Sequence, residues 1–67
     1  MINIKNGYKQ DVKVTCINGT IVKGFYSIYT QALDNDPEIA SITIERDNGS
    51  LIEIYENEIQ SIEELNQ

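Results

Sequence analysis

Residues 12–28, VKVTCINGTIVKGFYSI, decide the fold because they combine two alternating segments with a tight turn. Apolar side chains stand at every second position from Val12 to Cys16, which is the period-two pattern of a half-buried β-strand. Asn18 and Gly19 follow, and both residues tolerate the positive φ angles that a tight hairpin requires. The stretch therefore predicts an antiparallel β-hairpin.

The length of the hairpin loop determines which side chains of the second strand point inward. If the loop has an odd number of residues, with Gly19 at a bulge position, the inward positions are Val22, Gly24, Tyr26 and Ile28. If the loop has two residues, the inward positions are instead Ile21 and Phe25. A shift of one residue exchanges the two faces of a strand, and the sequence leaves both registers open.

The C-terminal half of the chain predicts three more strands. Isoleucines alternate with polar residues in 41–45 and again in 51–55, and the turn-forming residues 47–50 (DNGS) separate the two segments. A short break at 56–58 precedes a last strand near 59–64. The prediction is therefore an all-β, five-stranded antiparallel small barrel, because a flat sheet of such strands would leave its edges exposed.

We expect a single domain over residues 1–67, with its core in about 11–65 and an N-terminal extension over 1–10. Gly24, in the middle of the second strand, suits the sharp bend of a small barrel. Cys16 alternates with inward valines and is expected to be a small buried side chain. Tyr26 is expected in the core, with its hydroxyl group reaching a polar partner.

The composition excludes several classes of site. The chain has one cysteine and no histidine, so it has neither an intramolecular disulfide nor a Cys/His ligand set for zinc. A cysteine nucleophile would need an adjacent base, and a barrel of this size offers no deep cleft for paired carboxylates. We therefore expect a protein that is not an enzyme and that has no cofactor.

Formal net charge is −6, from eleven acidic and five basic residues. This charge disfavours nucleic acid and anionic lipid as partners, because both are polyanions. No segment has the apolar run of a signal peptide or of a membrane span. We expect a cytoplasmic protein without a membrane partner, and the unpaired Cys16 agrees with that location.

Residues 29–38, YTQALDNDPE, interrupt the strand pattern with carboxylates and the only proline. Asp34, Asp36 and Glu38 are candidate oxygen ligands for Ca²⁺ or Mg²⁺. The spacing and the glycine of an EF-hand loop are missing, and Asp, Asn and Pro are residues that turns select for local reasons. We therefore expect a solvated acidic turn and no bound metal.

Two motifs resemble those of Sm-like proteins. The first is the Asn18-Gly19 turn followed by Gly24 in a bent strand, and the second is the spacing of apolar residues in 54–62, IYENEIQSI. The resemblance covers about residues 11–65 and implies an Sm-like, SH3-like small barrel. Sm-like RNA binders carry an Arg-Gly pair before the fifth strand, where this chain has Tyr55-Glu56. The RNA-binding Arg-Gly motif is therefore absent.

The resemblance also implies self-assembly, since Sm-like barrels pair the fourth strand of one copy with the fifth strand of the next. The main functional hypothesis is accordingly a small acidic interaction module that forms a homo-oligomer through these edges. The residues expected at this oligomer edge are Leu51, Ile52, Ile54, Tyr55, Ile59 and Ile62.

Two alternatives belong to other functional classes. The first is an RNA-binding riboregulator of the Sm or Hfq type, which would use basic and aromatic side chains. Its candidate contacts are Lys13, Lys23, Tyr29 and Tyr55, with Lys5 and Lys9 as further cations. The second alternative is an acidic inhibitor or decoy that binds a basic protein surface, by analogy with inhibitors from mobile elements. Its acidic residues are Asp34, Asp36, Glu38, Glu45, Asp47, Glu53, Glu56, Glu58, Glu63 and Glu64.

Overall fold

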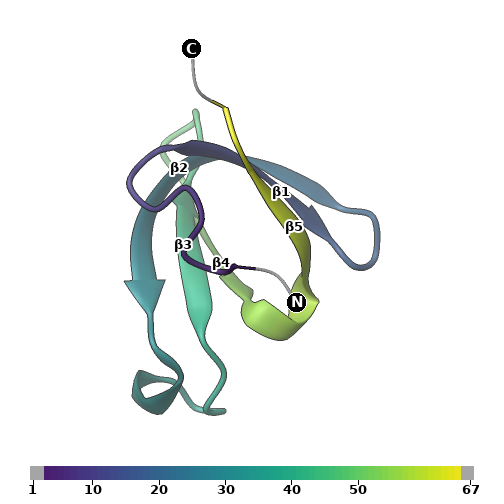
Figure 1. Cartoon of the computed structure of the whole chain (residues 1–67). Coiled ribbons are helices and arrows are strands. Elements are labelled where there is room, and N and C mark those ends of the chain that lie inside the picture. Colours follow the sequence, from purple (N-terminus) through teal and green to yellow (C-terminus); the bar gives the residue numbers. More distant parts are fainter. Residues whose placement is uncertain (1–2, 66–67) are drawn as a thin grey trace.

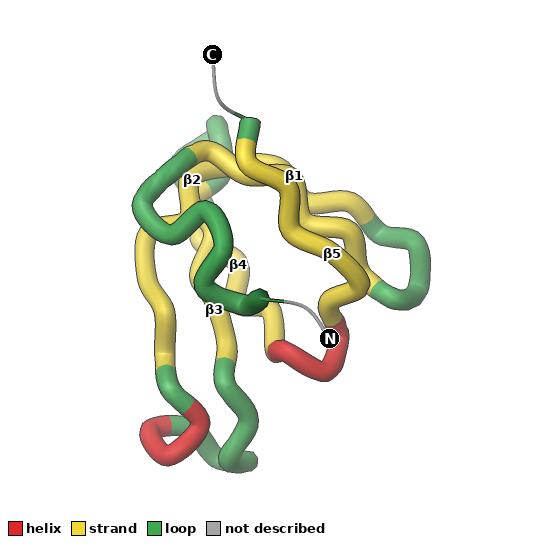
Figure 2. The backbone as a smooth tube through the Cα atoms, viewed as in Figure 1, coloured by secondary structure: helices red, strands yellow, loops and turns green. Residues whose placement is uncertain are grey.

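The computed structural model describes residues 3–65 and contains five antiparallel strands in one sheet (Figure 1). The strands are β1 (Asp11–Cys16), β2 (Ile21–Thr30), β3 (Ser41–Glu45), β4 (Leu51–Tyr55) and β5 (Ile59–Glu64). Two single-turn 3-10 helices are η1 (Ala32–Asp34) and η2 (Glu56–Glu58). The strand order is β4-β3-β2-β1-β5. The predicted all-β, five-stranded antiparallel fold is confirmed, and the sheet curls into a barrel that is not closed (Figure 2).

The loop of the β1–β2 hairpin has an odd number of residues, as one of the two predicted registers requires. The amide of Cys16 donates to the carbonyl of Thr20 at 2.8 Å, which leaves a three-residue loop over 17–19. Gly19 adopts a φ of 92° in this loop, in the left-handed region that glycine tolerates. Val14 pairs with Val22, and both side chains are buried. The odd-loop register is therefore confirmed for this part of the hairpin.

The inward alternation of β2 does not continue to Ile28. The register between β2 and β3 shifts between Tyr26 and Ile28, where one additional residue enters β2 as a bulge. Beyond the bulge, Tyr29 pairs with the buried Ile42 and packs against the core. Ile28 is 49% exposed, so the prediction that it points inward is wrong. The bulge exchanged the two faces of the strand.

The core combines side chains from all five strands with Ile4 of the N-terminal segment and Ala40, which precedes β3. Ile4 is buried, and the hydroxyl group of Tyr26 donates a hydrogen bond of 2.8 Å to its carbonyl oxygen. Cys16 is half-buried and packs against this core. The core thus extends beyond residues 11–65. The buried hydrophobic residues are Ile4, Val12, Val14, Val22, Tyr26, Ala40, Ile42, Ile44, Ile54 and Ile59.

Gly24 lies where β2 passes from its pairing with β1 to its pairing with β3. A Cβ atom at this position would meet the backbone oxygen of Glu45 and the side chain of Ile44. The absence of a side chain therefore lets β3 approach β2 closely. The hairpin of β2 and β3 then extends away from the barrel and ends in the segment 31–40, here called the tongue, which includes η1 (Figure 1).

Candidate functional site

The hydrogen bonds at the two ends of the β3–β4 ladder show which backbone groups of β4 face β3. The amide of Arg46 donates to Ser50 at 2.9 Å, and the amide of Glu56 donates to Ala40 at 2.8 Å. Hydrogen-bonded and non-hydrogen-bonded pairs alternate in an antiparallel ladder. The register then makes Ile52 and Ile54 the residues of β4 whose backbone groups bond to β3.

The backbone groups of the alternate residues, Leu51, Glu53 and Tyr55, consequently point away from β3 toward the free edge of β4. The amide of Tyr55 finds a partner there, because it donates to the carboxylate of Glu58 at 3.1 Å. Within residues 3–65, no strand pairs with this edge. Leu51 and Glu53 therefore present two N–H and two C=O groups that an added strand can use.

A cleft of about 370 Å³ opens beside this edge, between β4 and the β1–β2 hairpin. Its apolar lining comes from the inward side chains of β4, Ile52 and Ile54, together with Cys16 and Val22. The carboxyl-bearing residues Glu53 and Glu58 also line it, and both are exposed. The remaining lining residues are Ile17, Asn18 and Thr20. The cleft on the unclosed side of the barrel thus combines apolar side chains with polar residues and two exposed glutamates.

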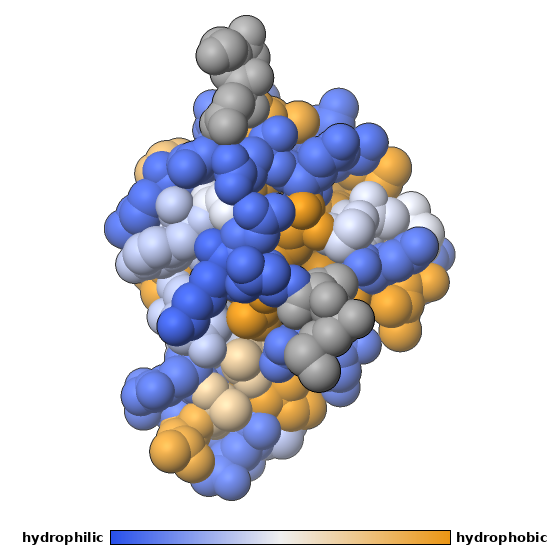
Figure 3. Space-filling model, viewed as in Figure 1, coloured by the Kyte–Doolittle hydropathy of each residue, from blue (hydrophilic) through white to orange (hydrophobic). Residues whose placement is uncertain are grey.

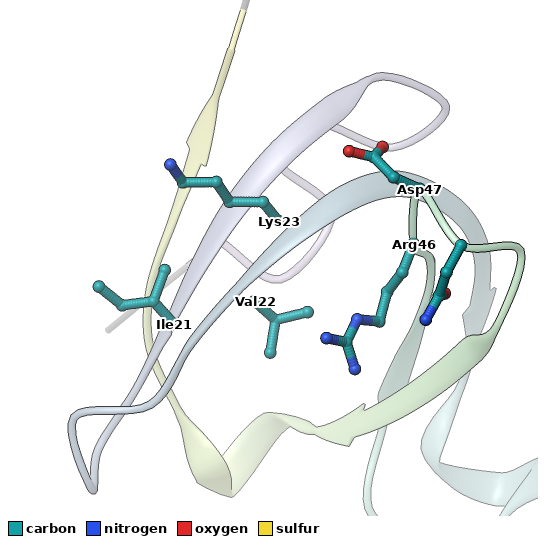
Figure 4. A pocket seen from close by; sticks show the side chains of 6 residues that line it. Ile21, Val22, Lys23, Arg46 and Asp47 are labelled. Carbon is teal, nitrogen blue, oxygen red and sulfur yellow. The ribbon is translucent and has the colours of Figure 1, made fainter.

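A second cleft of about 370 Å³ lies between the start of β2 and the turn that joins β3 to β4. Figure 4 shows Val22 and Arg46 pointing into this cleft, whereas Ile21 and Lys23 point away from it. Val22 lines both clefts, so the two are neighbours along the open side of the barrel.

The carboxylate of Glu53 joins β4 to the tongue. The hydroxyl group of the buried Ser41 donates to Glu53 at 2.7 Å. The side-chain amide of Asn35 donates to the Ser41 hydroxyl at 3.0 Å and to the carbonyl of Ile39 at 2.7 Å. These bonds hold the base of the tongue against β4 and fix the position of one Glu53 oxygen.

The free edge of β5 is partly covered. The amide of Leu65 donates to Asp11 at 2.9 Å, and the β1–β5 register then directs the backbone groups of Ile62 away from β1. The side-chain amide of Asn6 donates to the carbonyl of Ile62 at 2.9 Å. The N-terminal segment thus occupies one acceptor on this edge.

The six residues predicted at the oligomer edge have different environments. Leu51 is 63% exposed, and Ile52, Tyr55 and Ile62 are half-buried. Ile54 and Ile59 are buried in the core. Leu51, Ile52, Tyr55 and Ile62 therefore have exposed side-chain surface that a second copy could contact. Ile54 and Ile59 instead stabilise the barrel.

The aromatic residues predicted to contact nucleic acid do not share a surface. Tyr29 pairs with Ile42 on the inner face, whereas Tyr55 pairs with Ser41 one position further along, on the outer face. The ammonium group of Lys5 lies 5.0 Å from the centroid of the Tyr29 ring. The structure therefore does not bring Tyr29 and Tyr55 together as a stacking platform.

The two lysines predicted to contact nucleic acid lie on β1 and β2. Lys13 and Lys23 pair across β1 and β2, and Lys13 forms an ion pair of 3.8 Å with Glu63. Tyr29 lies six positions beyond Lys23 along β2, about 20 Å of extended chain. These cations and the candidate aromatic residues therefore do not form one site.

The three candidate metal ligands, Asp34, Asp36 and Glu38, are all exposed in the tongue. Within residues 3–65, no three acidic, cysteine or histidine side chains lie close enough to hold a metal ion. Asp34 instead accepts a hydrogen bond of 3.2 Å from the side chain of Gln31. The structure shows an acidic turn at this place.

Sequence reasoning missed the polar residues that shape this region, namely Asn6, Asn35 and Ser41. Ser41 precedes the inward Ile42, so period two places it on the outer face, but its burial depends on Asn35 folding over it. No local pattern identifies Asn6, because its partner is 56 residues away in the sequence.

No family model, curated protein or solved structure matches this chain. Within residues 3–65, none of the helices has the length and hydrophobicity that crossing a lipid bilayer requires.

Proposed function

We propose that this protein is a non-enzymatic interaction module that assembles with copies of itself, joining β4 of one copy to β5 of the next. One observation carries the proposal: within residues 3–65, the edge strands β4 and β5 each pair with another strand on one side only, and the backbone groups of Leu51 and Glu53 point outward from β4. The resemblance to Sm-like proteins supports the same arrangement, since those barrels join the same two strands.

Assembly would also cover apolar surface that a single copy exposes. Leu51 is 63% exposed, and Ile62 is half-buried beside the edge of β5. A chain of 67 residues has a small core, so the surface covered between copies adds to stability. The carbonyl of Ile62 accepts a bond from Asn6, and its second lone pair can accept a bond from a backbone N–H of a second copy.

The charge of the protein predicts how assembly depends on salt. Each copy carries a formal charge of −6, so copies repel one another at low ionic strength. Salt screens this repulsion. Self-assembly is therefore expected to strengthen as the salt concentration rises.

Light scattering of the purified protein tests the proposal. We expect a mass that is a multiple of 7.6 kDa, and a 7.6 kDa monomer at both low and high salt would refute self-assembly. Leu51→Pro removes an N–H group that points to the free edge while leaving the bonds to β3 intact. This variant should be monomeric, and circular dichroism would verify its fold. Leu51→Ala is the matched control, which keeps the N–H group and should still assemble.

A further inference from the structure

We infer that the free edge of β4 and its neighbouring cleft also bind an extended segment of another protein in which apolar and basic residues alternate. The segment would add to the sheet as a further strand. This function goes beyond self-assembly, although both use the same edge and so compete. Its three supports are the backbone groups, the cleft and the charge of β4.

The backbone groups determine the form of the ligand. Leu51 and Glu53 each present an N–H and a C=O group away from β3, and this pattern matches an incoming extended chain. An added strand would lie about 4.8 Å from β4 and would direct successive side chains to opposite faces of the sheet. The ligand must therefore suit two different surfaces at alternate positions.

One of these surfaces is apolar. The inward side chains of β4, Ile52 and Ile54, line the cleft together with Cys16 and Val22. Side chains of the added strand that lie beside Ile52 would cover this opening of about 370 Å³. Apolar residues are favoured at these positions, because they remove the exposed part of the lining from water.

The other surface carries exposed carboxylates beside the outward side chains of Leu51 and Tyr55. Glu53 points to the outer face of β4, and Glu45 lies opposite Leu51 on the same face. Both are exposed, as is Glu58 in η2, which follows β4. No basic residue occurs in 51–65. Figure 3 shows one face of the molecule, on which hydrophilic residues predominate and apolar residues lie between them. Basic residues are therefore favoured at the alternate positions of the ligand.

The β5 strand of a second copy satisfies only part of these requirements. It supplies Ile62, but it also carries Glu63 and Glu64 and no base. These carboxylates would approach the exposed carboxylates at the β4 edge, where like charges repel. A basic alternating segment matches both surfaces, so it is the occupant that the β4 edge fits best.

The test uses a fluorescently labelled synthetic peptide of alternating valine and lysine, one strand in length, and measures anisotropy as the protein is added. We expect saturable binding that weakens as salt rises, because salt screens the attraction between lysines and carboxylates. Self-assembly has the opposite salt dependence. A peptide with glutamate in place of lysine should not bind, and an N-methylated peptide should bind weakly because its amides cannot donate to β4.

Two matched variants locate the site. Glu53→Gln with Glu58→Gln removes two charges but keeps an acceptor for the Ser41 hydroxyl and for the Tyr55 amide. We expect this variant to bind the valine-lysine peptide about 3–10-fold more weakly. Asp36→Asn with Glu38→Gln removes the same charge from the tongue and should bind like the unaltered protein.

Three results would overturn the inference: no saturable binding at low salt, equal binding of the N-methylated peptide, or equal loss in both double variants. These results are separable from the failure of self-assembly. A protein that is monomeric in light scattering but binds the peptide would refute self-assembly alone. An oligomer that does not bind the peptide, including in the low-salt range where copies dissociate, would refute this inference alone.

Discussion

The hydroxyl group of Tyr26 donates a buried hydrogen bond of 2.8 Å to the carbonyl oxygen of Ile4. The same tyrosine accepts a backbone bond of 2.8 Å from Lys9 and donates one of 2.9 Å to Gln10. Its ring meets that of Tyr8 edge-on, with centroids 5.4 Å apart. Tyr26 is therefore the residue through which β2 holds the N-terminal segment on the barrel.

Replacing Tyr26 with phenylalanine should lower the free energy of unfolding by about 1–3 kcal/mol, because the buried carbonyl of Ile4 loses its donor. Urea denaturation monitored by circular dichroism measures this change. Tyr8→Phe is the control, since Tyr8 is 45% exposed and keeps its ring contact, and its effect should stay within about 0.5 kcal/mol. Equal effects in the two variants would contradict the assigned role of the hydroxyl group.

Stability should fall at alkaline pH because of the same residue. Burial, with smaller contributions from Tyr29 and Tyr8, raises the pKa of the Tyr26 phenol well above its ordinary value of 10.0. Above pH 10.0 the unfolded chain releases this proton while the folded chain retains it. Unfolding is then favoured, so the free energy of unfolding should be independent of this group below that pH and should decrease above it.

The measurement is urea denaturation in a series of buffers from neutral to alkaline pH. Tyr26→Phe should show a shallower alkaline decrease than the unaltered protein, although it is less stable at neutral pH. Identical alkaline slopes in the two proteins would show that another group causes the decrease.

Adding a methyl group at Gly24 should be strongly destabilising. The new Cβ would meet the backbone oxygen of Glu45, which cannot move without breaking the approach of β2 to β3. We expect Gly24→Ala to cost about 3 kcal/mol or more in thermal or urea unfolding. Gly49→Ala is the comparison, because Gly49 has a φ of 86° but open space, with no atom beyond its chain neighbours within 4 Å of where a Cβ would stand. Gly49→Ala should lower the free energy of unfolding by about 1–2 kcal/mol. A larger decrease for Gly49→Ala than for Gly24→Ala would contradict the close approach of β3 to Gly24.

The bulge in β2 can be tested with two isoleucines. Ile42 is fully buried, and Ile42→Ala should lower the free energy of unfolding by about 2–5 kcal/mol. Ile28 is 49% exposed, and Ile28→Ala should change it by about 0.5 kcal/mol or less. A large loss at Ile28 would indicate that β2 continues its alternation without a bulge.

The sequence predicted most of the sheet because the relevant signals are local. The alternation from Val12 to Cys16 and the turn at Asn18 and Gly19 act within a few residues, so the first hairpin could be predicted and its alternative registers stated. The five strands follow for the same reason. The confirmed burial of Tyr26 depends on period two within β2, upstream of the bulge.

Less of the candidate site than of the sheet could be predicted from local sequence signals. The expectation that Leu51 and Ile52 lie at a strand edge came from the resemblance to Sm-like proteins, whereas the backbone groups that face that edge depend on the pairing of β3 with β4. The separation of Tyr29 from Tyr55 onto opposite faces depends on the bulge, which no residue of β2 indicates. The cleft beside β4 arises because the sheet does not close.

The strands, the turns and the acidic charge could be read from the chain alone, because alternation, turn chemistry and charge are properties of neighbouring residues. The remaining features depend on contacts between distant parts of the chain. The bond from Tyr26 to Ile4 joins residues 22 apart, and the bond from Asn6 to Ile62 joins residues 56 apart. Such contacts depend on how the whole sheet curls, so they determine which edge is covered and which edge remains available to a partner.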